Sequence, residues 1–435
     1  MPNTETCINI SIERLTGDGW GVGYHQGKIT FVPGWLPGER GTAVIRESKK
    51  NWQRAEPVVL EEVSSQRIQP PCPVFAVCGG CQLQHLPYEE TLRWKRVWLQ
   101  ETLERIGKIQ AEIKPVIAMP DSWRYRNKAV LHRQNGQLGY YQERSNTLAA
   151  FEDCLLLSEA MNRWIKVMRE HLPTTGRIPS AVTLRENQMG RQGLILLEGL
   201  PESATAAKVG EAGAWLADLA AALNPSPPEF SVGMWGRSNR GSLKHVYGQR
   251  YLTVKIQDMV FEVSPLAFLQ VNDLQTEVLY GKILEWAELA GSEEVWDLYC
   301  GVGTISLLLS RCAGRVVGFD IHAAAVNDAR RNAQANQCGN VEFKEGKVEW
   351  EIVGMKTKPE VIVLDPPRAG AHPKVLEKIL EVQPRRLIYV SCDPGTLARD
   401  LKLLAAGGFA VVKVQPVDMF PWTGQVESMV LLSAL

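Results

Sequence analysis

The C-terminal part of the chain, residues 251–435, alternates short apolar segments with segments of helical character, and this alternation constrains the fold most strongly. Strands that alternate with helices pair in parallel, because each helix carries the chain back to the starting edge of the sheet. We therefore expect an α/β domain with a doubly wound, mainly parallel sheet. The expected strands read EVWDLYCG, RVVGFD, EVIVLDPP, RLIYVSC and AVVKVQPVDMF, and the expected helices cover residues 305–311, 323–336, 373–379 and 396–406.

A smaller β unit is expected at the N-terminus, within residues 1–62. The segment INISIERL alternates, and GKITFVPG and GTAVIRE are short runs between Gly and Pro turns. This pattern is typical of about five short strands, which form a small barrel of a kind that often binds oligonucleotides. Residues 46–54 hold four basic residues against Glu47, together with Trp52. That stretch indicates either an edge that contacts phosphates or a solvated hairpin.

Residues 63–250 have a mixed character and are expected to form an α+β central domain with a helix at about residues 88–106 and a loop at 223–230. Residues 123–144 contain five basic residues, one acidic residue and four Trp or Tyr rings. Cations suit phosphates and aromatic faces suit bases, so this stretch predicts contact with RNA. The alternative is an ordinary β surface.

Composition bounds the class of protein. The chain has 435 residues, 45% apolar residues and no formal net charge, so it is long enough for two or three packed domains, and its charge does not indicate nucleic acid. No apolar run approaches the ~20 residues of a membrane span, and residues 1–10 lack a signal pattern. We expect a cytoplasmic protein. Its nine cysteines should then be thiols, metal ligands or catalysts rather than disulfides.

A glycine loop follows the strand VWDLYCG. Gly301 and Gly303 lack Cβ atoms where the backbone must approach a ligand. Asp320 ends the next strand, where a carboxylate can accept hydrogen bonds from ribose hydroxyls. The loop indicates a nucleoside cofactor, either NAD or S-adenosylmethionine, and the alternative is a structural turn.

The segment VLDPPRAG places Asp365 and two prolines at another strand end. Nucleobase methyltransferases often carry Asp-Pro-Pro or Asn-Pro-Pro there, followed by an aromatic residue that holds an amine-bearing base. Arg368 stands at that position instead, which argues against amine methylation and leaves carbon methylation open. The alternative is a turn that caps a helix.

Cys392 ends the strand RLIYVSC, at the edge where α/β folds bind ligands, although cysteine is most often a buried hydrophobe. A thiolate that adds to C6 of uracil lets C5 take a methyl group from a sulfonium, after which a base must remove the C5 proton. Glu427, in the apolar segment GQVESMVLL, is the candidate base, because an apolar setting raises the pKa of a carboxyl. The alternative is an exposed glutamate on an edge strand. Cys300 is a rival nucleophile that we interpret as packing in the cofactor loop.

A compact cysteine motif, Cys72-x5-Cys78-x2-Cys81, predicts a metal site, with Cys154 as a possible fourth ligand. Four soft sulfurs suit zinc or an iron–sulfur cluster, and the spacing does not decide between them.

Taken together, the chain resembles the bacterial RNA uracil-C5 methyltransferases, most closely the iron–sulfur members that modify 23S ribosomal RNA. The resemblance covers nearly the whole sequence and rests on C-x5-C-x2-C, FLQVN, DLYCGVGT, LDPPRAG, VSCDPGTLARD and QVE. It implies a TRAM barrel, a central domain with four cysteines and a Rossmann-like methyltransferase domain. The implied product is 5-methyluridine in RNA, and the implied molecule is a monomer.

The resemblance also implies roles for individual residues. Cys392 matches the nucleophile, Glu427 the base, and Arg368 a functional arginine near the reacting base. Residues that match the S-adenosylmethionine and uracil pocket are Gln270, Tyr299, Asp320 and Asp365. The implied [4Fe-4S] ligands are Cys72, Cys78, Cys81 and Cys154.

Three positions depart from the family pattern: Asp320 replaces the usual Glu, and Trp422 and Gln425 replace histidines near the base. A transfer RNA target, and a non-catalytic RNA-binding factor, remain the alternative functions.

Overall fold

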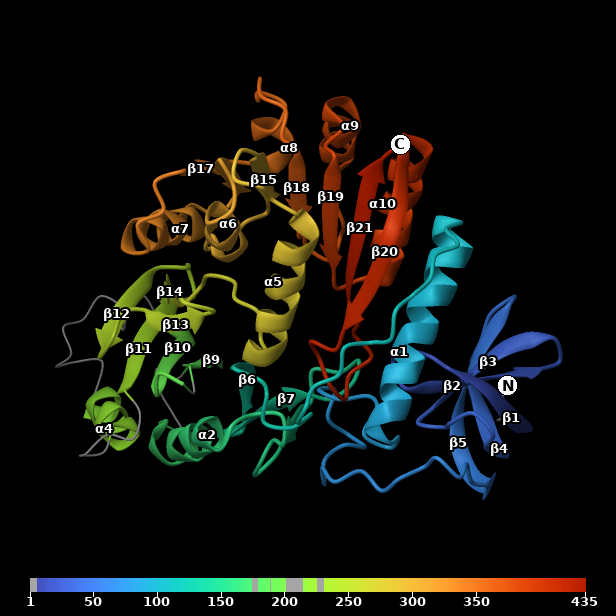
Figure 1. Ribbon diagram of the computed structural model, residues 1–435. Coiled ribbons are helices and arrows are strands. Elements are labelled where there is room, and N and C mark those ends of the chain that lie inside the picture. The colour runs from blue at the N-terminus through green and yellow to red at the C-terminus, as the bar shows by residue number, and fades with distance from the viewer. Residues whose placement is uncertain (1–5, 174–178, 188, 201–213, 225–230) are drawn as a thin grey trace.

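The computed structural model describes residues 6–173, 179–187, 189–200, 214–224 and 231–435. The loop expected at residues 223–230 therefore lies mostly outside the described residues. Three β units follow one another along the chain, and the N-terminal one projects from the side of the other two (Figure 1). The domain boundaries at residues 62 and 250 remain predictions.

The N-terminal unit is a closed barrel with the strand order β1-β2-β3-β5-β4. In β1, Ile8, Ile10 and Ile12 are buried while the residues between them are exposed, because neighbouring side chains of a strand point to opposite faces. The expected small barrel is thus confirmed. Its strands are β1 (Cys7–Leu15), β2 (Trp20–His25), β3 (Lys28–Pro33), β4 (Arg40–Ser48) and β5 (Trp52–Glu62).

The middle unit is a seven-stranded sheet with the order β12-β11-β10-β9-β6-β7-β8. Helices α2 (Glu159–His171) and α4 (Ala214–Leu223) pack on it through one apolar cluster. Its strands are β6 (Lys128–Gln134), β7 (Gln137–Tyr141), β8 (Leu148–Ala150), β9 (Ala181–Asn187), β10 (Gln192–Leu200), β11 (Ser231–Ser238) and β12 (Leu243–Tyr247). A separate hairpin, β13 (Leu252–Ile256) and β14 (Met259–Val263), follows.

The C-terminal unit is a seven-stranded sheet with the order β17-β16-β15-β18-β19-β21-β20. The pairs from β17 to β19 are parallel, and β21 is antiparallel to both β19 and β20. The expected doubly wound, mainly parallel sheet is therefore confirmed. Its strands are β15 (Glu294–Leu298), β16 (Arg315–Asp320), β17 (Val341–Glu345), β18 (Val361–Leu364), β19 (Arg386–Ser391), β20 (Phe409–Val417) and β21 (Glu427–Ala434).

Helices cover both faces of this sheet (Figure 1). Neighbouring residues of one strand, Val295 and Trp296, belong to separate apolar clusters, as expected for a sheet that is buried on both sides. The helices are α5 (Asp273–Ala287), α6 (Thr304–Ser310), α7 (Ala323–Ala335), α8 (Val348–Glu351), α9 (Pro373–Val382) and α10 (Pro394–Ala406).

Helix α1 (Tyr88–Thr102) stands between the barrel and the C-terminal sheet (Figure 1). It continues as a π-helical turn, η1 (Leu103–Gly107), which ends at Lys108 in the left-handed conformation. Leu99 and Leu103 pack in the same cluster as α10, and the Trp98 indole N–H donates to the Leu15 carbonyl oxygen at 2.7 Å. The helix therefore joins the barrel to the C-terminal domain. No helix in the described part of the chain is long and apolar enough to span a membrane.

Candidate active site

Cys392 lies at the C-terminal edge of the sheet, directly after β19. The antiparallel register pairs Ser391 with Ser428, so the next pair in that register is Cys392 and Glu427. Asp393 begins α10 as its N-cap, and its Oδ1 accepts a hydrogen bond from the Thr396 backbone N–H at 2.8 Å. An N-cap of this kind fixes the chain where the strand turns into the helix, and it holds the thiol at the edge of the sheet.

Glu427 is the first residue of β21, which has a partner strand on each side. The side chain is only 3% exposed, so the alternative of an exposed glutamate on an edge strand is wrong. Burial raises the pKa of Glu427 well above its ordinary value, and the neighbouring Asp365 carboxylate raises it further. The Arg368 guanidinium lowers this pKa and thus partly opposes both effects.

The same charges act on the thiol. Burial raises the pKa of Cys392 to about 11, Glu427 and Asp365 add to the rise, and Arg368 lowers it by charge and by a hydrogen bond. Burial and the Asp297 carboxylate likewise raise the pKa of Asp365 to about 7. Each of these groups thus changes the proton affinity of its neighbours, so the structure brings a thiol, two carboxyls and a guanidinium into one cluster.

The glycine loop shapes a pocket beside this cluster. Gly303 has a φ of +81°, and a Cβ there would lie 2.8 Å from the Phe343 ring, so the position requires glycine. Gly301 also has a positive φ, but a Cβ there would meet no atom within 4 Å, so open space lies above the loop. The pocket is lined by Phe268, Leu269, Tyr280, Tyr299, Cys300, Gly301, Val302, Thr304, Ile305 and Asp365.

Four residues were expected to contact the cofactor. Tyr299 and Asp365 line the pocket. Asp320 ends β16, and its two carboxylate oxygens accept from the backbone N–H groups of Gly301 and His322 at 2.9 and 2.8 Å. This leaves the outer lone pairs of the carboxylate free for further donors. Gln270 is buried but does not line the pocket, and its carbonyl oxygen accepts from Asn127.

Asp297 is a residue that the sequence analysis missed. It is fully buried on β15, accepts from the Ser306 hydroxyl at 2.5 Å, and has a pKa raised by burial to about 7. An acid within the apolar run EVWDLYCG was the available signal. Cys300, the rival nucleophile, is 8% exposed within the apolar core, and burial raises its pKa well above the ordinary value. The charged groups that act on Cys300 are Asp297 and Asp320, and both raise its pKa further, whereas the Arg368 cation lowers the pKa of Cys392. Cys300 therefore suits packing rather than attack.

The four cysteines of the expected metal site line one cavity of about 230 Å³. Burial raises the pKa of Cys154 to about 11, and the nearby Cys78 and Cys72 thiols add to the rise. Within the described part of the chain, however, no three His, Cys, Asp or Glu side chains are placed to hold a metal ion. The cavity also receives Arg126, Tyr140, Phe420 and Gln425.

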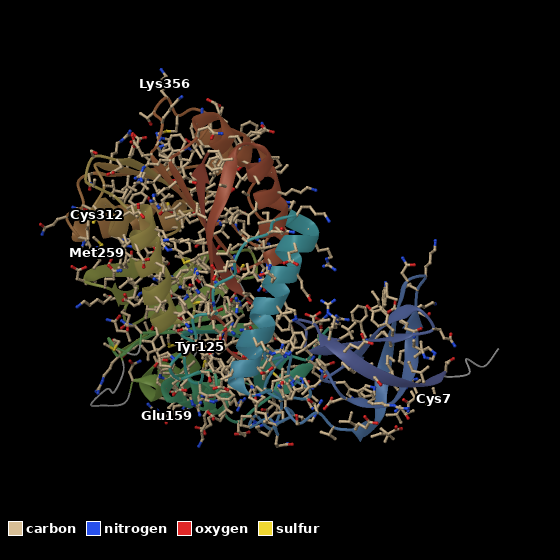
Figure 2. The ribbon with its side chains drawn as sticks, turned by 45° about the vertical axis from the view of Figure 1, so that its right-hand side comes forward. Cys7, Tyr125, Glu159, Met259, Cys312 and Lys356 are labelled. Carbon is tan, nitrogen blue, oxygen red and sulfur yellow. The ribbon has the colours of Figure 1, made fainter. Side chains whose placement is uncertain are left out.

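The basic and aromatic stretch at residues 123–144 is divided between the interior and the surface, where Tyr141 is 37% exposed, so the expected contact with RNA stays a prediction. Arg124 forms a two-pronged ion pair with Asp153, at 2.8 and 2.6 Å. Tyr125 is 8% exposed and lies among packed side chains in the middle of the molecule (Figure 2), and Trp123 stacks on Trp422 with ring centroids 4.4 Å apart. Amphipathic rings and guanidinium groups satisfy buried polar contacts as readily as phosphate contacts, so composition alone did not separate the two uses.

Trp422, which replaces a histidine of the family pattern, is 5% exposed and donates from its indole N–H to the Ser122 carbonyl oxygen at 3.1 Å. It has a φ of +65°, a conformation that costs a bulky residue energy and therefore requires support from its surroundings. Gln425, the other departure, lines the four-cysteine cavity. Both residues belong to the loop that precedes Glu427.

Comparisons with known proteins agree with this architecture. The profile of the family described as tRNA (Uracil-5-)-methyltransferase matches residues 211–435, and the TRAM domain profile matches residues 6–58. An uncharacterized RNA methyltransferase of Halalkalibacterium halodurans is 39% identical and covers 99% of this chain and 97% of its own. A second, from Listeria monocytogenes, is 38% identical and covers 98% of this chain and 97% of its own.

One solved structure matches over almost the full length. It is the Pyrococcus abyssi tRNA (uracil-54, C5)-methyltransferase in complex with S-adenosyl-L-homocysteine, with a TM-score of 0.77, 25% identity, and coverage of 98% of this chain and 99% of that one. The doubly wound sheet, its glycine loop and the TRAM barrel thus define an S-adenosylmethionine-dependent RNA methyltransferase. The chain belongs to the tRNA (uracil-5-)-methyltransferase family.

Proposed function

We propose that this protein methylates C5 of a specific uridine in RNA, with Cys392 as the nucleophile and Glu427 as the base. The observation that carries the proposal is the position of these two side chains. Cys392 directly follows β19, Glu427 begins the paired strand β21, and the Glu427 charge raises the pKa of Cys392. Asp365 acts on both groups and also lines the glycine-loop pocket. A nucleophile and a base must lie within reach of the same ring for this chemistry.

The residues act in sequence on the uracil ring. The Cys392 sulfur adds to C6, and the electron pair of the 5,6 double bond passes to C5 and O4 as an enolate. C5 then takes the methyl group that S-adenosylmethionine supplies, and the bond from that methyl to the sulfonium breaks as S-adenosylhomocysteine leaves. The Glu427 carboxylate removes the C5 proton, the C6–S bond breaks, and the 5,6 double bond re-forms with the thiolate as the leaving group. A positioned base of this kind contributes about 10²–10⁴ in rate.

The cofactor residues follow from the same edge of the sheet. Asp320, at the end of β16, would accept hydrogen bonds from the ribose hydroxyls of the cofactor. Tyr299 and Asp365 would contact the cofactor or the uracil from the pocket wall. Gln270 would contact the ligand only by turning its side chain towards the pocket. Arg368 would stabilise the thiolate and the enolate, because it is the cation next to Cys392.

We propose ribosomal RNA as the target class, on the combined resemblance of the barrel and the four cysteines to enzymes with that target. Transfer RNA is the second candidate, because the Pyrococcus abyssi relative carries a transfer RNA target in its description and spans the same length. The barrel alone therefore does not separate the two. Mapping 5-methyluridine in both RNA classes, from cells with and without the protein, decides between them. A cytoplasmic monomer is part of the proposal.

The four-cysteine cavity would hold a [4Fe-4S] cluster, and Cys72, Cys78, Cys81 and Cys154 would be its ligands. Four thiols around a cavity of about 230 Å³ suit a group larger than one ion, since a water molecule occupies about 30 Å³. A single zinc ion, which needs all four sulfurs ~2.3 Å from one point, is the alternative. When bound, the cluster would cross-link residues 72–81 to Cys154.

Analysis of anaerobically purified protein tests this cofactor. We expect iron and inorganic sulfide in about equal amounts, with ~4 of each per chain, together with the broad visible absorption of a cluster. Stoichiometric zinc without sulfide would contradict it.

Replacement of the nucleophile tests the reaction. Cys392→Ala should abolish 5-methyluridine formation, measured by mass spectrometry of digested RNA, while S-adenosylmethionine still binds. Cys312→Ser removes an exposed thiol elsewhere and should keep full activity. Methylation by the Cys392 variant would rule out the covalent route, and cofactor binding without methylation by the wild-type protein would favour a non-catalytic RNA-binding role.

A further inference from the structure

The loop at residues 418–426 connects β20 to β21 and ends directly before Glu427. The register of the two strands pairs Val417 with Glu427, so Asp418 immediately follows the cross-strand neighbour of the base. Any displacement of Asp418 would therefore shift the first pair of the hairpin and with it the Glu427 carboxyl.

A buried ion pair holds this end of the hairpin. Lys95 of α1 and Asp418 both have side chains with no exposed area, and the Lys95 Nζ lies 2.5 Å from Asp418 Oδ1. The Tyr88 hydroxyl donates to Asp418 Oδ2 at 2.7 Å and accepts from the Met119 backbone N–H at 2.9 Å. The Lys95 ammonium also donates to the Phe420 carbonyl oxygen at 2.9 Å. Helix α1 thus binds the loop at two residues, Asp418 and Phe420.

Stability alone does not explain a pair in this position. Charges removed from water lose hydration energy that their mutual attraction barely restores, and well-packed apolar residues often replace such a pair without loss of stability. What the pair provides beyond packing is direction, because each oxygen of Asp418 accepts a bond of defined geometry from α1.

Three other parts of the chain hold the rest of the loop through its backbone carbonyl oxygens. Asn272 donates to the Met419 oxygen at 3.3 Å, and the Tyr125 hydroxyl donates to the Pro421 oxygen at 3.2 Å. The N–H groups of residues 82 and 83, next to the cysteine motif, donate to the Trp422 oxygen at 3.0 and 3.1 Å. Ile117 holds the backbone on either side of Val417: its N–H donates to the Pro416 oxygen and its carbonyl oxygen accepts from the Asp418 N–H, both at 3.0 Å. The ion pair adds a side-chain contact directly after Val417.

We propose that Lys95, Asp418 and Tyr88 form a positioning network for the base: they fix the β20–β21 hairpin so that the Glu427 carboxyl reaches the C5 proton of the adduct. This inference rests on the proposed function, because it concerns the step that Glu427 performs. The network touches neither substrate nor cofactor. Its loss should therefore slow the release of the covalent RNA adduct without slowing its formation.

Two double variants of the full-length protein separate direction from packing. Lys95→Met with Asp418→Leu removes both charges together and leaves no unpaired charge in the core. Lys95→Gln with Asp418→Asn also removes both charges, but the Gln amide can still donate to the Asn oxygen and the Asn amide can donate to the Tyr88 hydroxyl, so both contacts are kept with the second one reversed. Lys378→Met is the matched control, since Lys378 is 8% exposed and, among the residues that the structure describes, pairs within its own helix α9, with Glu381 at 2.7 Å.

The readout is the fraction of protein bound covalently to RNA during turnover, measured on denaturing gels, together with S-adenosylmethionine affinity. We expect the Met/Leu variant to bind the cofactor within about twofold of wild type, to form the adduct normally, and to resolve it at least tenfold more slowly. The Gln/Asn variant and the Lys378 control should resolve it at nearly the wild-type rate. Equal losses in adduct formation and resolution, or wild-type resolution by the Met/Leu variant, would overturn the inference.

Tyr88→Phe keeps the test decisive if the Met/Leu variant does not fold. It removes one hydrogen bond to Asp418 and should slow resolution severalfold, whereas resolution at the wild-type rate would overturn the inference. If Glu427→Gln traps an adduct but neither network variant does, only the positioning role fails. If no variant or wild-type protein ever forms an adduct, the proposed function and this inference fail together.

Discussion

At the scale of single residues, the position of Cys392 supports its proposed role as a nucleophile over a role as core filler. The thiol is only partly buried, at the edge of the sheet, and it shares its electrostatic environment with Glu427, Asp365 and Arg368. Cys300, which directly precedes the glycine loop, instead packs in the core at the wall of the cofactor pocket. Two cysteines that both follow sheet strands thus differ in burial and in the charges around them.

Arg368 should control the pH dependence of attack on uracil. The pKa of Cys392 is raised to about 11, so the thiol is mostly protonated at pH 7 and the rate of adduct formation should rise about tenfold per pH unit above that. Arg368→Gln removes the cation that lowers this pKa, and should slow adduct formation about tenfold or more at pH 7. Rapid-quench measurement of adduct formation at several pH values checks this.

The matched control is Arg368→Lys, which keeps the positive charge and should retain most of the rate. A pH profile that is flat between pH 7 and 9 in the wild-type protein, or one that Arg368→Gln leaves unchanged, would contradict this role of Arg368.

At the scale of secondary-structure elements, strand ends and the turns after them place the chemistry. Strand–helix alternation predicted the sheet, because buried parallel strands and amphipathic helices have different apolar patterns. The helix expected at residues 396–406 is α10, which begins two residues earlier because Asp393 caps it. The sequence did not show that β21 lies inside the sheet, since strand order depends on contacts that an apolar pattern does not record.

The two loop glycines should fail in different ways when substituted. Gly303→Ala places a Cβ 2.8 Å from the Phe343 ring at a φ of +81°, so it should lower thermal stability with or without cofactor. Gly301→Ala meets no protein atom within 4 Å, so it should cost only about 1–2 kcal/mol of backbone strain but weaken S-adenosylmethionine binding. Thermal unfolding and cofactor titration calorimetry measure both effects. An equal loss of stability in the two variants would contradict this distinction.

At the scale of the whole molecule, contacts between distant segments assemble the site. Lys95 and Asp418 are 323 residues apart in the chain, and Cys154 joins a cavity whose other cysteines lie at residues 72–81. Local patterns predicted Cys392, Glu427 and the glycine loop, because each stands at a strand end. They did not predict the Lys95 pair, since a lysine within a helical pattern is ordinarily solvated. They also did not show that the aromatic residues at 123–144 divide between the interior, where Tyr125 is buried, and the surface, where Tyr141 is exposed.

The covalent adduct is the central claim of this account, and Glu427→Gln tests it most directly. The amide keeps the size of the side chain but cannot remove the C5 proton, so methylated RNA should remain bound to Cys392. The measurement is mass spectrometry of the denatured protein after incubation with RNA and S-adenosylmethionine. We predict a Cys392 peptide that carries methylated uridine in Glu427→Gln and none in Cys392→Ala. Free 5-methyluridine at the wild-type rate from Glu427→Gln, without any adduct, would contradict the account.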